Sequence, residues 1–97
     1  MKKTYLVLYT SIPSTIAIED NQRAVISILK SRDFQILELD GANIENATLR
    51  SKLWALPGSK RAIYPQVYEK KSEEDYEYVG DFDKIIQLND SGDLFNK

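Results

Sequence analysis

The chain has 97 residues, of which 42% are hydrophobic and 29% are charged, and its formal net charge is −2. This length and composition predict one globular domain, and the mixed charges lack the basic face that is typical of nucleic-acid-binding proteins. Cysteine and histidine are both absent, so the chain itself supplies no thiol chemistry, no disulfide and no histidine base. No apolar run reaches the length of a membrane span and no secretory signal pattern is present. We therefore expect a cytoplasmic protein that binds neither membranes nor nucleic acid.

The first part of the chain predicts a strand, a helix and a second strand. The run TYLVLYT (4–10) is apolar and rich in β-favouring residues, as in a central strand that is buried on both faces. Ser14 or Thr15 can cap the helix that follows, which is expected to end near Ser31. Its buried stripe is predicted to comprise Ala17, Ala24, Val25, Ile28 and Leu29. The run FQILEL (34–39) predicts a second strand, parallel to the first through a right-handed crossover.

The second part of the chain predicts a helix, a hairpin and a last helix. Asn43 can cap a helix that carries leucines on one face and ends at Pro57. A strand is expected from Pro65 to about Glu69, and a polar turn separates it from the short returning strand YEYV (76–79). Gly92 is the expected C-terminal cap of the last helix.

These elements follow one another in the order β-α-β-α-β-β-α. The order predicts an α/β domain with a mixed four-stranded sheet and helices on both faces. It is also the order of thioredoxin-like folds, including that of glutaredoxins, which place a cis-proline at the start of the third strand. Pro65 in the segment IYPQV stands at this position. We therefore expect a single thioredoxin-like domain over residues 1–97 with a cis Tyr64–Pro65 bond.

Four segments carry a resemblance to a known family: STIAIEDNQRAV (14–25), NIEN (43–46), PQVY (65–68) and YVGDFD (78–83). In this order they resemble proteins of the SH3-domain-binding glutamic-acid-rich-like family. The resemblance implies a thioredoxin-like fold without the catalytic cysteines, which in a glutaredoxin would fall near Ser14 and Ala17. It also implies that the chain is a small non-enzymatic adaptor.

Some members of this family display a proline-rich SH3 ligand beside the cis-proline. An SH3 groove binds a polyproline helix with the pattern P-x-x-P, whereas the segment RAIYPQVY (61–68) contains a single proline. This departure speaks against canonical SH3 binding. The expected partner is therefore another protein or peptide.

The candidate binding residues lie in the SIPST loop, at the expected cis-proline and at the start of the last helix: Ser14, Thr15, Tyr64, Pro65, Phe82 and Asp83. Helix N–H groups next to Ser14 and Thr15 could hold an anion or a peptide backbone, although capping is the commoner role of such residues. The backbone at Tyr64 and Pro65 could pair with an extended peptide. The alternative is that this proline only shapes the start of the strand.

The last two candidates stand at the predicted start of the last helix. The segments YPQVY (64–68) and YVGDFDKIIQLNDSGDL (78–94) resemble glutaredoxins. This resemblance implies that the backbone N–H groups of Phe82 and Asp83 meet a ligand carboxylate, with the Asp83 side chain near an amine. The alternative is an ordinary helix start with Phe82 in the core. Lys60 and Arg61 could supply positive charge nearby.

Two functions stay open at this point, together with a third possibility, a structural or self-associating module. The first is a monomeric binding or adaptor module that recognises an extended peptide or protein in the groove between these three segments, without catalytic residues, a metal or a cofactor. The alternative is a glutathione-binding protein, either a carrier or a redox or transferase protein whose ligand supplies the thiol. The acidic stretch EKKSEEDYEY (69–78) lacks a calcium-loop spacing and is expected to be solvated surface.

Overall fold

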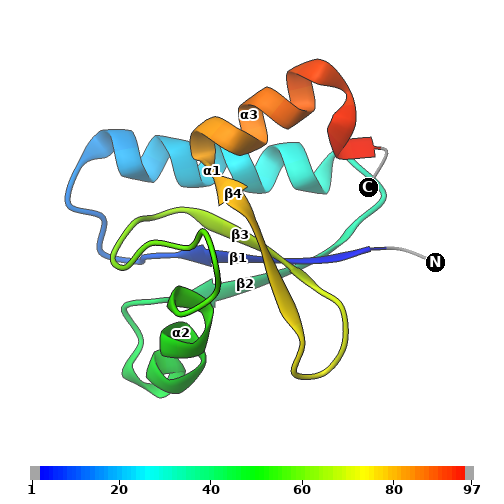
Figure 1. The fold of residues 1–97 in the computed structure, drawn as a ribbon. Helices are drawn as coiled ribbons and strands as arrows, with labels where there is room; N and C mark the ends of the chain where they lie inside the picture. Colours follow the sequence, from blue (N-terminus) through cyan, green and yellow to red (C-terminus); the bar gives the residue numbers. More distant parts are fainter. Residues whose placement is uncertain (1–2, 96–97) are drawn as a thin grey trace.

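In the computed structural model, which describes residues 3–95, four strands form one sheet between two layers of helices (Figure 1). The elements in chain order are β1 (Thr4–Tyr9), α1 (Ile16–Lys30), β2 (Gln35–Asp40), η1 (Ile44–Asn46), α2 (Ala47–Trp54), β3 (Gln66–Lys70), β4 (Tyr76–Asp81), α3 (Phe82–Ser91) and η2 (Asp93–Phe95). The predicted order is confirmed, with the two short 3-10 helices η1 and η2 added. β3 begins at Gln66 rather than at Pro65, because proline has no N–H to donate to a neighbouring strand.

The sheet is mixed and has the strand order β2-β1-β3-β4. β1 pairs in parallel with β2 and antiparallel with β3, and β3 pairs antiparallel with β4. The predicted parallel unit and the predicted hairpin are therefore both confirmed. The register places Leu8 opposite Gln66 and Gln66 opposite Asp81. Because of this register, the segments that follow β1, precede β3 and follow β4 meet at one end of the sheet.

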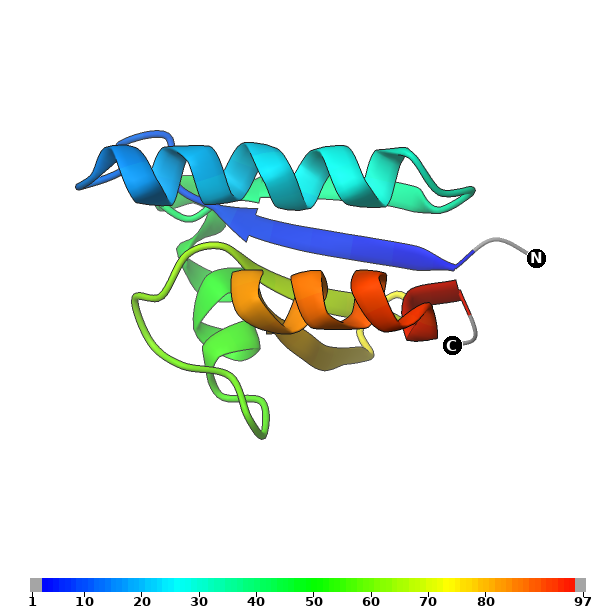
Figure 2. The same cartoon turned by 90° about the horizontal axis from the view of Figure 1, so that it is seen from above.

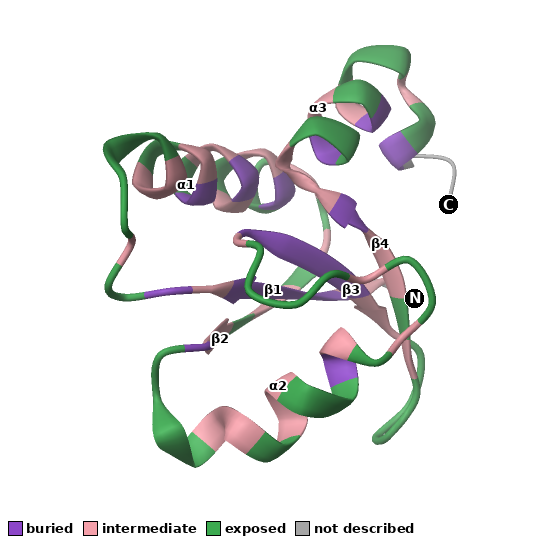
Figure 3. Ribbon diagram, turned by 60° about the vertical axis from the view of Figure 1, so that its left-hand side comes forward, coloured by how far each residue is buried: buried purple, intermediate pink, exposed green. Residues whose placement is uncertain are grey.

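Helices cover both faces of the sheet, as the element order predicts. α1 and α3 lie side by side over one face (Figure 2), and α2 lies over the other (Figure 1). Side chains of a strand alternate between its two faces, so the central strands β1 and β3, the most completely buried (Figure 3), contribute to two cores. The core beneath α1 and α3 contains Tyr5, Val7, Val25, Leu29, Val67, Ile85, Leu88 and Leu94. The core beneath α2 contains Leu6, Leu8, Leu53 and Tyr68.

Short-range hydrogen bonds determine the helix ends. Thr15 caps α1, because its Oγ1 accepts a hydrogen bond from the backbone N–H of Ile18 at 3.1 Å. Gly92 has a φ of 80° and caps the C-terminus of α3, as predicted. Asn43 caps η1 rather than α2, because the chain forms a 3-10 turn before α2. Its Oδ1 accepts a hydrogen bond from the N–H of Glu45 at 3.0 Å.

The buried stripe of α1 differs from the prediction at its start. Val25 and Leu29 are fully buried, as predicted. Ala17 is exposed, contrary to the prediction, because the first turn of α1 projects beyond the end of β1 (Figure 2). The first buried residue of α1 is instead Gln22.

Candidate functional site

A groove opens at the end of the sheet where the chain leaves β1 and approaches β3. It has a volume of about 280 Å³ and is lined by Thr10, Ile12, Ser14, Ile18, Ala42, Ala62 and Tyr64. These residues come from the SIPST loop and its flanks, from the segment after β2 and from the segment before β3. The structure therefore brings the SIPST loop and Tyr64 to one surface.

Four of the six predicted site residues lie in the segments that form this groove. Ser14 and Tyr64 line it directly. Thr15 is exposed and its side chain is engaged in capping α1. Pro65 is fully buried, and its peptide bond to Tyr64 is cis, as predicted.

The other two predicted residues, Phe82 and Asp83, are not among the residues that line this groove. Phe82 packs against the core beneath α1 and α3, and Asp83 is exposed in the first turn of α3. The cap of α3 is Asp81, whose Oδ1 accepts a hydrogen bond from the N–H of Lys84 at 3.1 Å. α3 nevertheless begins at the same end of the sheet, because Asp81 at the end of β4 lies opposite Gln66 at the start of β3.

One exposed isoleucine lines this groove and a second lies in a segment that forms it. The large hydrophobic residues exposed within residues 3–95 are Ile12 (76%), Ile16 (76%), Ile44 (85%) and Ile63 (43%). Ile12 lines the groove, and Ile63 stands between the lining residues Ala62 and Tyr64. Exposed apolar side chains in a hollow are typical of binding sites in soluble proteins. Sequence reasoning missed Ile12, although an isoleucine beside a proline in a loop outside the predicted elements was a usable signal.

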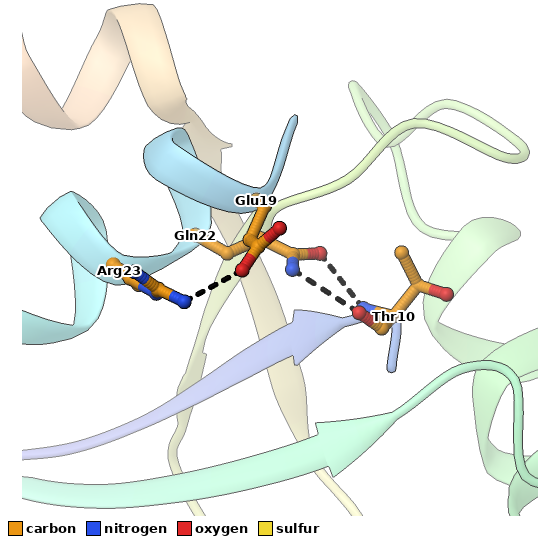
Figure 4. A network of polar contacts seen from close by, with 4 residues as sticks. All are labelled: Thr10, Glu19, Gln22 and Arg23. Carbon is orange, nitrogen blue, oxygen red and sulfur yellow. Dashed lines mark hydrogen bonds and ion pairs between the residues drawn. The ribbon is translucent and has the colours of Figure 1, made fainter. Parts of the chain in front are cut away.

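A buried glutamine of α1 holds the loop that follows β1 (Figure 4). The Oε1 of Gln22 accepts a hydrogen bond from the N–H of Thr10 at 2.8 Å, and its Nε2 donates to the carbonyl of Thr10 at 3.1 Å. On the solvent side, Arg23 and Glu19 form an ion pair at 2.6 Å. Sequence reasoning missed the role of Gln22. Its position three residues before Val25, on the buried stripe of α1, was the available signal.

A second buried glutamine shapes the segment before β3. The Oε1 of Gln66 accepts hydrogen bonds from Ser59 Oγ at 3.1 Å and from the N–H of Lys60 at 3.0 Å. Its Nε2 donates to the carbonyls of Lys60 at 2.6 Å and Ile63 at 2.8 Å. Both polar atoms of this fully buried side chain are therefore satisfied. Gln22 and Gln66 together hold two walls of the groove in place.

An aspartate at the end of β2 holds the segment after β2, which lines the groove with Ala42. One oxygen of Asp40 accepts hydrogen bonds from the N–H groups of Ser11 at 3.0 Å and Ala42 at 2.9 Å. Burial opposes ionisation of Asp40, but the hydrogen bonds from these two residues outweigh it and lower the pKa of the carboxyl group. The carboxylate is therefore ionised at neutral pH and is engaged in holding the loops.

Positive charge lies behind the tyrosine wall of the groove. The guanidinium groups of Arg50 and Arg61 lie 4.9 Å and 5.7 Å from the centre of the Trp54 ring. Trp54 in turn meets Tyr64 edge to face, with 6.3 Å between the ring centres. Burial raises the pKa of Tyr64, although the charge of Arg50 acts in the opposite direction. Tyr64 is therefore a neutral hydrogen-bonding group next to an exposed cation, Arg61.

The part of the chain that the structure describes contains no group of three or more aspartate or glutamate side chains that could hold a metal ion. None of its helices has both the length and the apolar character needed to cross a membrane. No protein-family model matches this chain, and no curated protein matches it. The resemblance to the SH3-domain-binding glutamic-acid-rich-like family therefore stays a prediction.

Proposed function

We propose that this chain is a non-catalytic binding or adaptor module of the SH3-domain-binding glutamic-acid-rich-like type, monomeric and cytoplasmic, that holds an extended peptide in the groove at Ser14 and Tyr64. The proposal includes a thioredoxin-like fold. It is supported by the strand order β2-β1-β3-β4, with two helices over one face of the sheet and α2 over the other.

The exposed isoleucines of the groove are the observation that carries this proposal. Ile12 leaves 76% of its surface in water although it lines a hollow. Full burial of an isoleucine side chain is worth about 1.5–3 kcal/mol, so a peptide that covers Ile12 and Ile63 gains a useful part of its binding free energy there. The contact area is small, and we therefore expect weak, micromolar binding.

The glutathione alternative has one specific feature in its favour. Lys60 and Arg61 are exposed cations in the segment before Tyr64, and they would attract a small ligand that carries carboxylates. Since the chain has no cysteine, the thiol in any such reaction would have to come from the ligand.

A selection experiment tests the peptide proposal. Random peptides displayed on phage are selected on the whole immobilised chain, and the enriched peptides are measured against Ile12→Asp. We expect this variant to bind at least about tenfold more weakly, because the introduced carboxylate must be desolvated in an apolar contact. Ile44→Asp is the matched control, since Ile44 is equally exposed isoleucine surface but does not line the groove.

The outcomes separate the two functions. Equal binding of the enriched peptides to both variants, or no enrichment at all, contradicts the peptide proposal. The labelled chain is titrated with reduced glutathione in parallel and followed by amide NMR. Saturable shifts at Ser14, Tyr64 and Asp83, together with failed peptide selection, would favour the glutathione alternative.

A further inference from the structure

A second cleft lies on the α2 side of the sheet, between α2 and the turn that joins β3 to β4. Figure 1 shows both segments on the same side of the sheet. The cleft has a volume of about 310 Å³, at the lower end of the range of about 300–1,000 Å³ for ligand pockets. It shares no lining residue with the groove at Ser14 and Tyr64.

The floor of this cleft is apolar. Leu53 is almost fully buried in the core beneath α2, and Leu49, Leu56 and Tyr76 pack against that core while staying partly exposed. All four line the cleft. They are left partly uncovered because α2 has only eight residues and, within residues 3–95, no second α-helix lies beside it on this face.

One lip of the cleft is acidic. Glu73, Glu74 and Asp75 line it from the β3–β4 turn and are exposed. The turn is held by backbone hydrogen bonds, the shortest from the N–H of Lys71 to the carbonyl of Asp75 at 2.8 Å. The acidic stretch, expected to be solvated surface, is therefore both solvated and one side of a defined hollow.

The acidic lip is only weakly neutralised. The Oε2 of Glu73 lies 4.0 Å from the Nζ of Lys70, and 97% of the Glu73 side chain is exposed. An ion pair so exposed adds little to the binding free energy between the two charges. The neighbouring Lys71 is engaged with Glu77 at 3.4 Å. On the opposite lip, Lys52 is the basic residue that lines the cleft. The lining therefore carries three carboxylates against one ammonium group.

We propose that this cleft docks a basic and apolar peptide segment of a partner protein. A large aliphatic or aromatic side chain of the peptide covers Leu53 and Leu56, and an adjacent lysine or arginine lies at Glu74 and Asp75. The apolar floor supplies the contact area, and the negative charge of the lip favours a positively charged partner. The site is independent of the groove at Ser14, so the chain could hold two partners at once, as an adaptor requires.

Peptide titration of the labelled whole chain tests this proposal. The probe is the acetylated and amidated peptide Lys-Leu-Arg-Leu-Lys, followed by amide NMR at low salt. We expect saturable shifts confined to α2 and the β3–β4 turn. Glu74→Lys should weaken binding about fivefold or more, because it replaces an attractive rim charge with a repulsive one. Lys52→Glu should strengthen binding by about threefold, because it adds a carboxylate to the other lip.

Matched controls distinguish a specific site from general charge attraction. Asp90→Lys makes the same charge change at an exposed position of α3, and its affinity should stay within about twofold of the unchanged chain. A peptide with serines in place of the leucines should lose binding. An equal loss for Asp90→Lys, equal binding of the serine peptide, or shifts at Ile12 and Tyr64 instead of α2 would each overturn the proposal. Loss of binding for Asp90→Lys, or equal binding of the serine peptide, leaves the peptides selected for the other groove unaffected, whereas shifts at Ile12 and Tyr64 would place the probe in that groove.

Discussion

Helices α1 and α3, with 15 and 10 residues, cover one face of the sheet, whereas α2, with eight residues, covers the other. The core beneath α1 and α3 contains eight buried hydrophobic residues, and the core beneath α2 contains four. Partly buried hydrophobic residues border both cores, among them Phe34 and Phe82 on the α1 side and Trp54, Tyr64 and Leu56 on the α2 side. The face with the longer helical cover therefore has the larger fully buried core.

This difference assigns different roles to the two faces. Tyr64, which lines the groove, and the leucines that floor the acidic cleft all belong to the surroundings of the α2 core. Partly covered apolar surface can accept a partner, whereas a closed core cannot. We infer that the acidic cleft belongs to the α2 face, whereas the groove lies at the end of the sheet, between the start of α1 and Tyr64.

Each side of the sheet has a buried leucine, a buried glutamine and a buried tyrosine. These are Leu29, Gln22 and Tyr5 on the α1 side, and Leu53, Gln66 and Tyr68 on the α2 side. The same substitution made in both members of a pair compares how much each side of the sheet contributes to the free energy of unfolding.

The leucine pair should give the largest effect. Leu29→Ala should lower the free energy of unfolding by about 3–4 kcal/mol, because it leaves a closed cavity. Leu53→Ala should cost only about 2 kcal/mol, because Leu53 borders the acidic cleft and the space left by truncation is open to water. Urea unfolding followed by circular dichroism measures both values. An equal or larger loss for Leu53→Ala would contradict the contrast between the faces.

The glutamine pair should come next. Gln66→Leu should cost about 2–4 kcal/mol and Gln22→Leu about 1–3 kcal/mol, because Gln66 makes four hydrogen bonds and Gln22 makes two. Amide exchange should accelerate at Lys60 in the first variant and at Thr10 in the second. Arg23→Ala is the exposed control and should change stability by less than about 0.5 kcal/mol. Exchange that accelerates equally at both loops in both variants would show that the two loops are not held separately.

The buried Tyr68 should make the stability of the fold depend on pH in the alkaline range. Burial raises the pKa of Tyr68 from 10.0 to about 12, although the hydrogen bond with Ser59 acts in the opposite direction. Since the folded pKa exceeds the unfolded one, the stabilisation is complete below about pH 10 and is lost as the pH rises toward about 12. The loss attributable to this group is on the order of 2–3 kcal/mol at most. Urea midpoints from neutral to alkaline pH should decline less steeply for Tyr68→Phe, and an identical decline would contradict the assignment.

The hydroxyl groups of the tyrosine pair should give the smallest effects, of opposite sign. Tyr68 Oη shares a hydrogen bond of 2.7 Å with Ser59 Oγ, whereas the buried Tyr5 Oη has no hydrogen-bond partner within residues 3–95. At neutral pH, Tyr68→Phe should cost about 1 kcal/mol, and Tyr5→Phe should be neutral or stabilising by up to about 1 kcal/mol. Urea unfolding of both variants checks the signs. Destabilisation by Tyr5→Phe would indicate that its hydroxyl is satisfied in solution.

Much of the site's framework was predictable from the sequence. The strands, the α1 cap Thr15 and the α3 cap Gly92 depend on residues within a few positions of one another. The element order then predicted the layers of the fold and the meeting of the SIPST loop with Tyr64. Phe82 and Asp83 start α3 at the same end of the sheet, but they are not lining residues of that groove: packing, which local patterns do not encode, places Phe82 against the core and leaves Asp83 exposed.

By itself, the sequence determined which segments become strands and helices and excluded chemistry that needs cysteine or histidine, because these features depend on composition and local periodicity. Only the tertiary structure decided that Gln22 and Gln66 hold the loops that form the groove. It also decided that an acidic cleft stays open between α2 and the turn that joins β3 to β4. A glutamine has no preferred partner until packing places one within hydrogen-bond distance. A leucine stripe likewise predicts that a helix face is covered, but the lengths and positions of the neighbouring elements decide how much of it stays open.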